Sequence, residues 1–146
     1  MKIKSIGIAA DHAGFELKKV IKDLLVTEGY NVNDYGTKSA DSVDYPDYGH
    51  VLANAVEQGE NSIGISLCGS GNGINMTANK HQGIRSAICW NREIAAYARK
   101  HNDANICALP ARFISREEAR QVVLMFLNTD FEGGRHTRRV EKIPHC

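Results

Sequence analysis

The stretch NSIGISLCGSGNGINMTANK, residues 61–80, decides the fold of this chain. Its apolar and partly β-branched segment Ile63–Leu67 predicts a short buried strand that stops at Cys68. The glycine-rich turn Gly69–Gly73 follows, and the residues after it favour a helix through Lys80. A glycine-rich turn between a strand and a helix lets backbone amides converge on an anion, with the positive end of the helix dipole behind them. This segment therefore predicts an anion-binding turn in an α/β fold.

Cys68 is a candidate for chemistry because of its position. A thiol at the end of the strand is aimed into the same pocket as the turn, and the positive end of a helix stabilises the thiolate form of cysteine. A free cysteine without such a position packs as a small hydrophobic residue. We interpret Cys89 and Cys107 in that way, because both lie in apolar, strand-like runs. One segment thus offers both a base or nucleophile and a cradle for developing negative charge.

Other protein classes also use glycine-rich turns, and the spacing here disfavours two of them. GSGNG has the pattern GxGxG and not the GxGxxG of dinucleotide-binding proteins, and it follows the third predicted strand. The segment Ile88–Trp90, about twenty residues further on, holds no acid for a ribose. A P-loop is excluded because no Gly-Lys-Ser/Thr follows. A plain tight turn is the remaining alternative, weakened by three glycines among the five residues 69–73.

Strand-like and helix-like segments alternate along the whole chain. The predicted strands are Ile3–Ala9, Tyr30–Asn33, Ser62–Leu67, Arg85–Cys89 and Asn105–Leu109. The predicted helices are Gly14–Glu28, Tyr48–Gln58, Ile74–Lys80, Arg92–Lys100 and Ser115–Leu127, the last with Ser115 and Glu118 as a capping box, and a glycine break and a short basic helix follow Asp130. The alternation predicts a single α/β domain over residues 1–146, a three-layer α/β/α sandwich around a five-stranded parallel, Rossmann-like sheet.

Length, charge and cysteine content narrow the class of protein. A chain of 146 residues is long enough for one proper core. Its net charge of +1 gives no reason to expect binding to nucleic acid or to an anionic membrane. The apolar runs are far shorter than a membrane span, and the start MKIKSIGIAADHAG lacks the hydrophobic stretch of a signal peptide. The four cysteines form no CxxC pair, which favours reduced thiols and a cytoplasmic protein.

Polar residues gather where the predicted strands end, and ligands of parallel α/β sheets bind beyond these carboxyl ends. Asp11 and His12 follow the first strand, and Cys68 ends the third. Tyr45 lies in the loop beyond the second strand, and Arg112 comes shortly after the fifth. Asp11 and His12 have an equally good structural interpretation, as a helix N-cap with a solvated neighbour.

Two further polar segments lie later in the chain. His101 and Asn102 are either functional or a polar helix end, where histidine favours the negative end of the dipole. Arg135 and Arg139 are four residues apart and share a helix face. They form either a solvated basic surface or, with Arg112, a clamp for a phosphate, to which guanidinium geometry is well suited.

The histidines are not spaced like the ligands of a metal. The six of them show no HxH or HExxH pattern, so we expect no metal site. His136, next to Arg135, is interpreted as a surface residue.

Several motifs in a fixed order carry a family resemblance. They are Asp11-His12, Asp44-Tyr45-Pro46, Cys68-Gly69-Ser70-Gly71-Asn72-Gly73, Ala78-Asn79-Lys80, Gly83-Ile84-Arg85, His101-Asn102-Asp103, and Gly133-Gly134-Arg135-His136 with Arg139. Each motif is weak alone, but all of them in this order are highly specific. The chain resembles, over essentially its whole length, the ribose-5-phosphate isomerase B family, part of a wider group that includes galactose-6-phosphate isomerase subunits.

The resemblance implies an aldose–ketose isomerase of the pentose phosphate pathway. Such an enzyme interconverts ribose 5-phosphate and ribulose 5-phosphate through an enediolate, with no metal and no organic cofactor. By resemblance, Cys68 moves the proton between C2 and C1, and His101 opens the furanose ring. The resemblance also implies a catalytic role for Ser70, which is expected to persist because the hydroxyl is kept where threonine is common. Ile74 stands where some members carry a glutamate base. The other implied roles are contacts of the Gly69–Gly73 amides with the enediolate oxygen, of His12, Arg112, Arg135 and Arg139 with the phosphate, and of Asp11, Tyr45 and Asn102 with the sugar hydroxyls.

Alternatives to this function belong to three classes. The first is an isomerase of allose 6-phosphate or galactose 6-phosphate. The presence of both GGRH and HND favours the pentose phosphate, since galactose-type members of the resembled group tend to depart from these motifs. The second is a sugar-phosphate-binding protein without catalysis, against which the intact Cys68 and His101 argue. The third is a dinucleotide-binding oxidoreductase, already disfavoured by the spacing of the glycine turn.

The predicted strand boundaries place the site residues on two opposite edges of the sheet. His101 precedes the fifth strand and belongs to the amino edge, whereas Cys68 belongs to the carboxyl edge. A strand of five residues separates the edges by about 17 Å, which a histidine side chain cannot cross. The basic tail with Arg135 and Arg139 likewise follows a helix that returns to the amino edge. We therefore expect a homodimer with shared active sites and with the C-terminal helix at the interface. The resemblance implies the same, because members of the resembled family are dimers with the site at the interface. Whether two dimers pair into a tetramer stays open.

Overall fold

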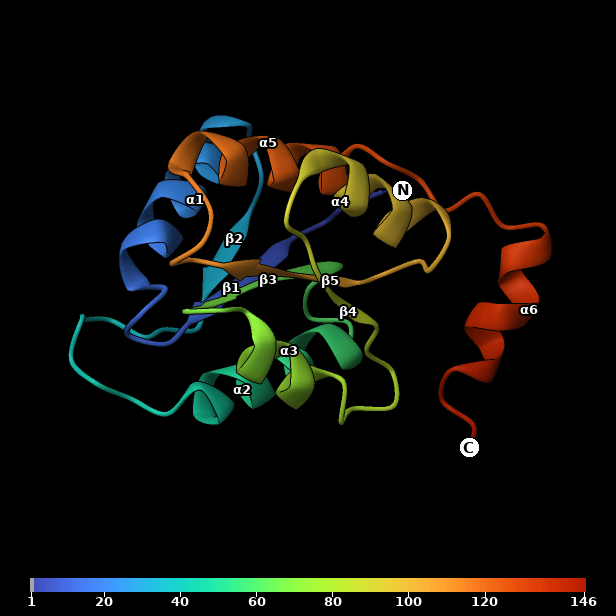
Figure 1. Ribbon diagram of the computed structural model, residues 1–146, viewed down its shortest axis with the longest axis horizontal. Helices are drawn as coiled ribbons and strands as arrows, with labels where there is room; N and C mark the ends of the chain where they lie inside the picture. The colour runs from blue at the N-terminus through green and yellow to red at the C-terminus, as the bar shows by residue number, and fades with distance from the viewer. Residues whose placement is uncertain (1) are drawn as a thin grey trace.

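The computed structural model describes residues 2–146, and its centre is a parallel sheet. The five strands lie in the order β2-β1-β3-β5-β4, and each neighbouring pair is parallel. In Figure 1 the sheet runs through the middle of the molecule with helices above and below it. The strands are β1 Ile6–Ala10, β2 Val32–Asp34, β3 Ile63–Cys68, β4 Ser86–Ile88 and β5 Ile106–Pro110.

Helices cover both faces of the sheet, which confirms the predicted three layers. On one face, Ile65 of the sheet packs in a cluster with Ile21 of α1 and Phe126 of α5. On the other face, Ile106 packs with Leu52 of α2. Among residues 2–146, none of the helices is both long and apolar enough to cross a membrane. The helices are α1 Phe15–Thr27, α2 Tyr45–Glu57, α3 Asn72–Ala78, α4 Arg92–Lys100, α5 Arg116–Leu127 and α6 Arg135–Lys142.

The predicted alternation of strands and helices is confirmed, and the differences lie at the boundaries. The first strand begins at Ile6 and not at Ile3. Helix α2 begins at Tyr45 instead of Tyr48, so the prediction that Tyr45 lies in a loop is wrong. Pro46 explains the early start, because proline has no N–H group and fits the first turn of a helix.

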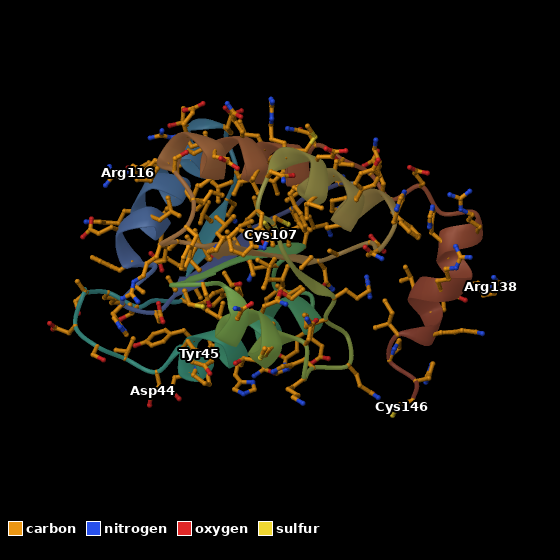
Figure 2. The ribbon with its side chains drawn as sticks, viewed as in Figure 1. Asp44, Tyr45, Cys107, Arg116, Arg138 and Cys146 are labelled. Atoms are coloured by element: carbon orange, nitrogen blue, oxygen red, sulfur yellow. The ribbon has the colours of Figure 1, made fainter. Side chains whose placement is uncertain are left out.

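Helix α6 stands apart from the sheet and from the helices that cover it, at the right of Figure 1. Gly133 and Gly134 precede it with φ values of 69° and 58°, which glycine adopts readily, so the predicted glycine break is confirmed. Within α6, His136 is the only buried residue. Arg138 points away from the body of the molecule in Figure 2. Most of the surface of this basic helix is therefore exposed in a single chain.

Candidate active site

Strand β3 and helix α3 meet at the glycine-rich turn that the sequence predicted. Cys68 is the last residue of β3 and is only 4% exposed. Helix α3 begins at Asn72, earlier than the predicted Ile74, and Gly71 precedes it with a left-handed φ of 79°. The hydroxyl of Ser70 accepts a hydrogen bond from the Asn72 amide at 3.2 Å. Cys68 thus lies directly before a turn whose backbone is fixed in the left-handed region that glycine adopts without strain.

The side chains of Arg112 and Tyr45 lie against this turn. A Cβ atom placed on Gly69 would lie 3.3 Å from Nη1 of Arg112, and the Gly69 carbonyl accepts a hydrogen bond from the Arg112 amide at 2.9 Å. A Cβ atom placed on Gly73 would lie 2.5 Å from the ring of Tyr45, closer than real Cβ atoms approach. The glycines therefore let a guanidinium group and an aromatic ring approach the backbone of the turn closely.

Asp11 lies at the neighbouring carboxyl end of β1. Its amide donates a hydrogen bond to the Leu67 carbonyl at 3.2 Å, which fixes the ends of β1 and β3 side by side. Its Oδ1 atom accepts hydrogen bonds from the amides of Ala13 and Gly14 at 2.9 and 3.1 Å. Asp11 therefore stabilises the turn that leads into α1, but the N-cap of this helix is Gly14, so the interpretation of Asp11 as an N-cap is wrong.

His12 is held on one side by the loop before α2. The backbone of Val43 contacts the Nδ1 atom of His12 through its N–H group at 3.1 Å and its carbonyl oxygen at 3.2 Å. The Nε2 atom is consequently the ring nitrogen that remains for a ligand. The residues at this edge of the sheet form the carboxyl-edge group: Asp11, His12, Tyr45, Cys68–Gly73 and Arg112.

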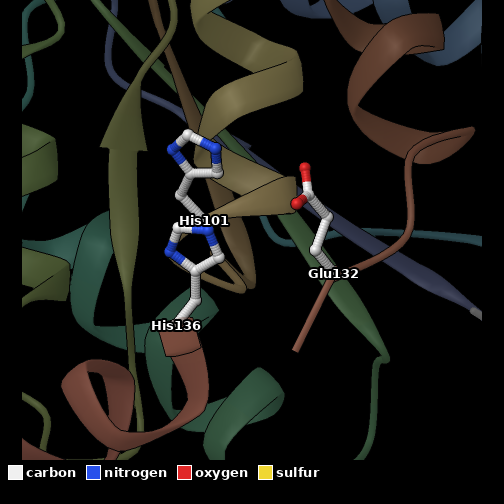
Figure 3. A group of neighbouring side chains, drawn as sticks. All are labelled: His101, Glu132 and His136. Carbon is white, nitrogen blue, oxygen red and sulfur yellow. The ribbon is translucent and has the colours of Figure 1, made fainter. Parts of the chain in front are cut away.

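A second set of polar residues lies at the amino edge of the sheet. His101 is the C-cap of α4, directly before the loop that leads to β5. Its ring stacks on that of His136, with a centroid distance of 4.3 Å and an interplanar angle of 13°. Figure 3 shows the two stacked imidazoles with the carboxylate of Glu132 beside them. These residues form the amino-edge group: His101, Asn102, Glu132, Arg135, His136 and Arg139.

The interpretation of His136 as a surface residue is wrong, because its side chain is only 8% exposed. Burial lowers the pKa of His136 below its ordinary value, and the charges of His101 and Arg135 lower it further. A neutral ring is therefore favoured at neutral pH, and neutral imidazole can both donate and accept a hydrogen bond.

Sequence analysis missed Arg99, which holds the amino-edge group in place. This guanidinium is buried and donates hydrogen bonds to the carboxylate of Asp103 at 2.9 Å and to the carbonyl of Ala104 at 2.6 Å. It also donates to the carbonyl of Thr129 at 3.1 Å. Arg99 thereby ties the end of α4, where His101 lies, to the segment before α6. A signal was present in the apolar stripe of α4, since Arg99 falls one turn after the buried Ala95.

The thiols of the chain differ in the way that the sequence predicted. Cys89 and Cys107 are both fully buried, and Cys107 lies at the centre of the molecule in Figure 2. A hydrogen bond with Cys89 and burial raise the pKa of Cys107 well above its ordinary value, so its reactive thiolate form is suppressed. Cys68 differs because it lies at the end of its strand, against the turn.

The body of the sheet separates the two groups. Cys68 pairs with Pro110 at the carboxyl end of β5, whereas His101 precedes the amino end of the same strand. In Figure 1 helix α6 lies to the right, beyond the amino ends of the strands, while β3 runs leftward to the glycine turn. The predicted placement of His101 at the opposite edge from Cys68 is confirmed. One chain brings the members of each group together, but not the two groups.

The fold and the carboxyl-edge group define a class of parallel α/β proteins in which a glycine-rich turn follows a strand that ends in a thiol. Within that class, the chain belongs to the Ribose/Galactose Isomerase family, which matches residues 6–143.

Individual relatives of known sequence or structure agree with this assignment. The chain is 43% identical to ribose-5-phosphate isomerase B of Escherichia coli over 141 residues, 97% of this chain and 95% of the relative. A solved ribose-5-phosphate isomerase B of Thermotoga maritima superposes with a TM-score of 0.96 at 47% identity, covering 97% of this chain and 98% of that one. The enzyme of Mycoplasma genitalium, solved with bound ribulose-5-phosphate, superposes with a TM-score of 0.92 at 41% identity, covering 96% and 93% of the two chains.

Proposed function

We propose that this protein is an aldose–ketose isomerase that interconverts ribose 5-phosphate and ribulose 5-phosphate. The observation that carries the proposal is the position of Cys68, at the end of β3 directly before a glycine turn that Arg112 and Tyr45 cover. The family membership and the ribulose-5-phosphate bound to the Mycoplasma genitalium relative support the same substrate class.

Proton transfer follows from the chemistry of the carboxyl-edge group. The Cys68 thiolate removes the proton from C2 of the open-chain aldose, and the electron pair of the C–H bond moves to form the enediolate. The O2 hydroxyl loses its proton, O1 gains one, and the resulting thiol returns the first proton to C1, which yields the ketose. The amides of the turn from Gly69 to Gly73 donate hydrogen bonds to the oxygen on which negative charge develops, and Ser70 holds that turn through the Asn72 amide.

Ring opening and phosphate binding require the amino-edge group. His101 transfers a proton between the anomeric hydroxyl and the ring oxygen, which opens the furanose. Arg135 and Arg139 bind the phosphate together with His12 and Arg112, while Asp11, Tyr45 and Asn102 contact the sugar hydroxyls. A phosphate clamp remote from the reacting carbons uses its binding energy to align the flexible open-chain sugar.

These roles require a second subunit, because one chain holds the two groups on opposite edges of its sheet. The active protein is accordingly a homodimer in which the amino-edge group of each subunit completes the carboxyl-edge group of the other. The state of α6 supports this assembly: a cavity of about 490 Å³, lined by Arg85, Asp103 and Val140 among others, lies between α6 and the body of its own chain. Ile143, just after α6, is 56% exposed, so its apolar side chain is available for contact with a second subunit.

The four cysteines are all unpaired in the structure, three of them buried. Unpaired thiols are typical of a reducing compartment. This supports a protein of the cytoplasm that acts in pentose phosphate metabolism.

A coupled assay of the purified protein tests the reaction. Ribose 5-phosphate, allose 6-phosphate and galactose 6-phosphate are supplied in parallel, and we expect the highest kcat/KM with ribose 5-phosphate. Faster turnover of a hexose phosphate would assign the protein to the other branch of its family. Binding of all three sugars without turnover would instead indicate a non-catalytic binding protein.

Mixing two inactive variants tests the shared site. Cys68→Ala lacks the base and His101→Ala lacks the ring-opening group, so each homodimer is expected to be inactive. A mixed dimer holds one site with both residues intact, and we expect about half of the parent activity per heterodimer, because one of its two sites works. No recovery, despite subunit exchange confirmed by mass spectrometry, would mean that both residues act from one chain.

A further inference from the structure

The amino-edge group contains two imidazoles and a carboxylate that converge. Ligand atoms of His101, Glu132 and His136 all lie within 4.8 Å of one another. Figure 3 shows the carboxylate of Glu132 to the right of both stacked rings. The three residues come from three segments of the chain: the end of α4, the loop before α6, and α6 itself.

Two imidazoles and one carboxylate form a ligand set of zinc sites that keep a fourth position open. Zn–N and Zn–O bonds are about 2.0–2.2 Å long, so the ligand atoms of a tetrahedral site lie about 3.3 Å apart. The observed spread needs a contraction, and the two stacked rings must rotate, because an imidazole binds a metal through a lone pair that lies in the plane of its ring. Glu132 is exposed and can move inward.

We propose that His101, Glu132 and His136 form a binding site for a divalent transition-metal ion of the Zn²⁺ class. The site is reversible, because the cationic Arg135 and Arg139 lie on the same helix as His136 and oppose the binding of a cation. The ion is therefore an inhibitor and not a resident cofactor.

Inhibition of the isomerase by the metal ion rests on the proposed function. It follows because His101 is both a ligand of the ion and the residue that opens the sugar ring. An ion bound to His101 occupies the nitrogen lone pair that ring opening requires. Metal and substrate therefore compete for one imidazole, and free Zn²⁺ lowers isomerisation while removal of the metal restores it.

The binding test uses Co²⁺ as a spectroscopic probe on the full chain. Cys68→Ser and Cys146→Ser are combined in the background, since these thiols are the alternative ligands outside the core. We expect the ligand-field absorption of tetrahedral Co²⁺ without a thiolate charge-transfer band, and its loss when Zn²⁺ is added. Glu132→Gln, which keeps the size of an exposed side chain, and His136→Asn should each weaken Co²⁺ binding at least about tenfold.

His81→Ala is the matched control, because the chain has a second imidazole pair. There Nδ1 of His50 lies 2.7 Å from Nε2 of His81. We expect this control to bind Co²⁺ like the background. The proposal is overturned if no tetrahedral Co²⁺ signal forms, if Glu132→Gln leaves the affinity unchanged, or if His81→Ala abolishes binding.

The activity test uses Cys146→Ser, which keeps Cys68. Zn²⁺ should inhibit it reversibly, with recovery on addition of a chelator, and the Glu132→Gln variant should need at least about tenfold more Zn²⁺ for the same fractional loss of its own metal-free rate. Binding of Co²⁺ without inhibition by Zn²⁺ would refute the inhibitory role alone. Binding of Co²⁺ by a protein that isomerises no sugar would refute the proposed function and leave the metal site standing.

Discussion

The two edges of the sheet hold their polar groups in different ways. At the carboxyl edge, backbone hydrogen bonds and close glycine contacts fix the side chains: Asp11 is tied to β3, and Arg112 and Tyr45 lie on the glycine turn. At the amino edge, His101 and His136 rest on each other and on a helix that stands away from the body. At the second edge the two histidines are buried or half-buried, but Arg135 and Arg139 are exposed.

This difference fits the two tasks of the proposed reaction: proton transfer at the carboxyl edge and phosphate binding at the amino edge. A base and the donors that stabilise an enediolate must be preorganised within a few tenths of an ångström, and strand ends provide that rigidity. Phosphate binding tolerates movement, since long arginine side chains reach a large anion from several directions. Arg135 and Arg139 are exposed on α6, which suits the phosphate-binding role proposed for them.

The largest expected effect is at the carboxyl edge. Replacement of Cys68 by serine should lower kcat with ribose 5-phosphate by about 10²–10⁴-fold, because a serine hydroxyl is far too weak a base at neutral pH. Ile74, just after the glycine turn, is apolar and cannot act as a base in place of the thiol. The coupled assay measures kcat, and circular dichroism checks the fold.

Cys146→Ser is the matched control, since this exposed thiol should leave kcat unchanged. A Cys68→Ser enzyme that kept more than about a tenth of the parent rate, or about 1.4 kcal/mol of barrier, would remove Cys68 from its role as base.

The next largest effect concerns the stability of the carboxyl edge. Asp34 ends β2 and accepts hydrogen bonds from the buried ammonium of Lys18 at 2.6 and 2.8 Å. Asp34→Ala leaves this charge buried without a partner and should lower the free energy of unfolding by about 3 kcal/mol. Lys22→Ala removes the more exposed partner of Asp34, 3.2 Å away, and should cost less than about 1 kcal/mol. Urea denaturation measures the free energy of unfolding of both variants. Equal losses of stability in Asp34→Ala and Lys22→Ala would show that burial of Lys18 is unimportant.

The same pair predicts a pH dependence. Burial raises the pKa of Asp34, but hydrogen bonds from Lys18 and the Gly36 amide, with the charge of Lys18, outweigh burial, so the pKa lies below its ordinary value. A carboxyl group with a lowered pKa stabilises the fold above its unfolded pKa, and this contribution is lost as the pH falls below about 4. The stability difference between the parent and Asp34→Asn should therefore be constant from neutral pH down to about 4 and shrink below it.

How much of this could be read from the sequence differs between the two edges. The glycine turn and Cys68 were predictable, because glycine spacing and a thiol at a strand end are local signals. The start of α5 was equally local: the Ser115 hydroxyl accepts a hydrogen bond from the Glu118 amide at 3.1 Å, as predicted for its N-cap. The start of α2 also has a local signal, since Pro46 fits the first turn of a helix, although the apolar pattern alone predicts a later start.

The contacts of the amino edge are not local, and sequence analysis predicted few of them. The burial of His136 depends on the stacking with His101, which only the folded chain brings about. The cluster with Glu132 likewise joins three segments that no spacing rule for metal ligands relates. Strand order alone still placed His101 and Cys68 on opposite edges, since that placement follows from connectivity and not from side-chain packing.

Phosphate binding provides the fourth prediction and tests the arginines of α6. Arg135→Ala and Arg139→Ala each remove a charge-assisted hydrogen bond, which should weaken binding of ribose 5-phosphate by about 1.5–3 kcal/mol, or roughly 10–150-fold. Arg138→Ala is the matched control, because Arg138 lies on the same helix and points away from the body. Inorganic phosphate serves as the competitor, and binding of unphosphorylated ribose should not change. Equal inhibition of the parent and both variants by phosphate would place the arginines on a solvated face.

The smallest expected effect concerns Ser70. It tests whether the glycine turn at the carboxyl edge acts through its backbone amides or through a side chain. The Ser70 hydroxyl accepts a hydrogen bond from the Asn72 amide at 3.2 Å and so holds the turn before α3. Ser70→Ala removes this contact and should raise the barrier by about 0.5–1.5 kcal/mol, a loss of roughly 2–12-fold in kcat. Ser70→Thr keeps the hydroxyl and restricts its rotamers, so kcat should stay within about twofold of the parent. If the backbone preorganises the carboxyl edge, Ser70→Ala should lose only this small part of kcat and keep the KM of the parent. If Ser70→Ala instead lost as much activity as Cys68→Ser, the hydroxyl would itself take part in proton transfer, and the turn would owe its function to a side chain and not to its amides.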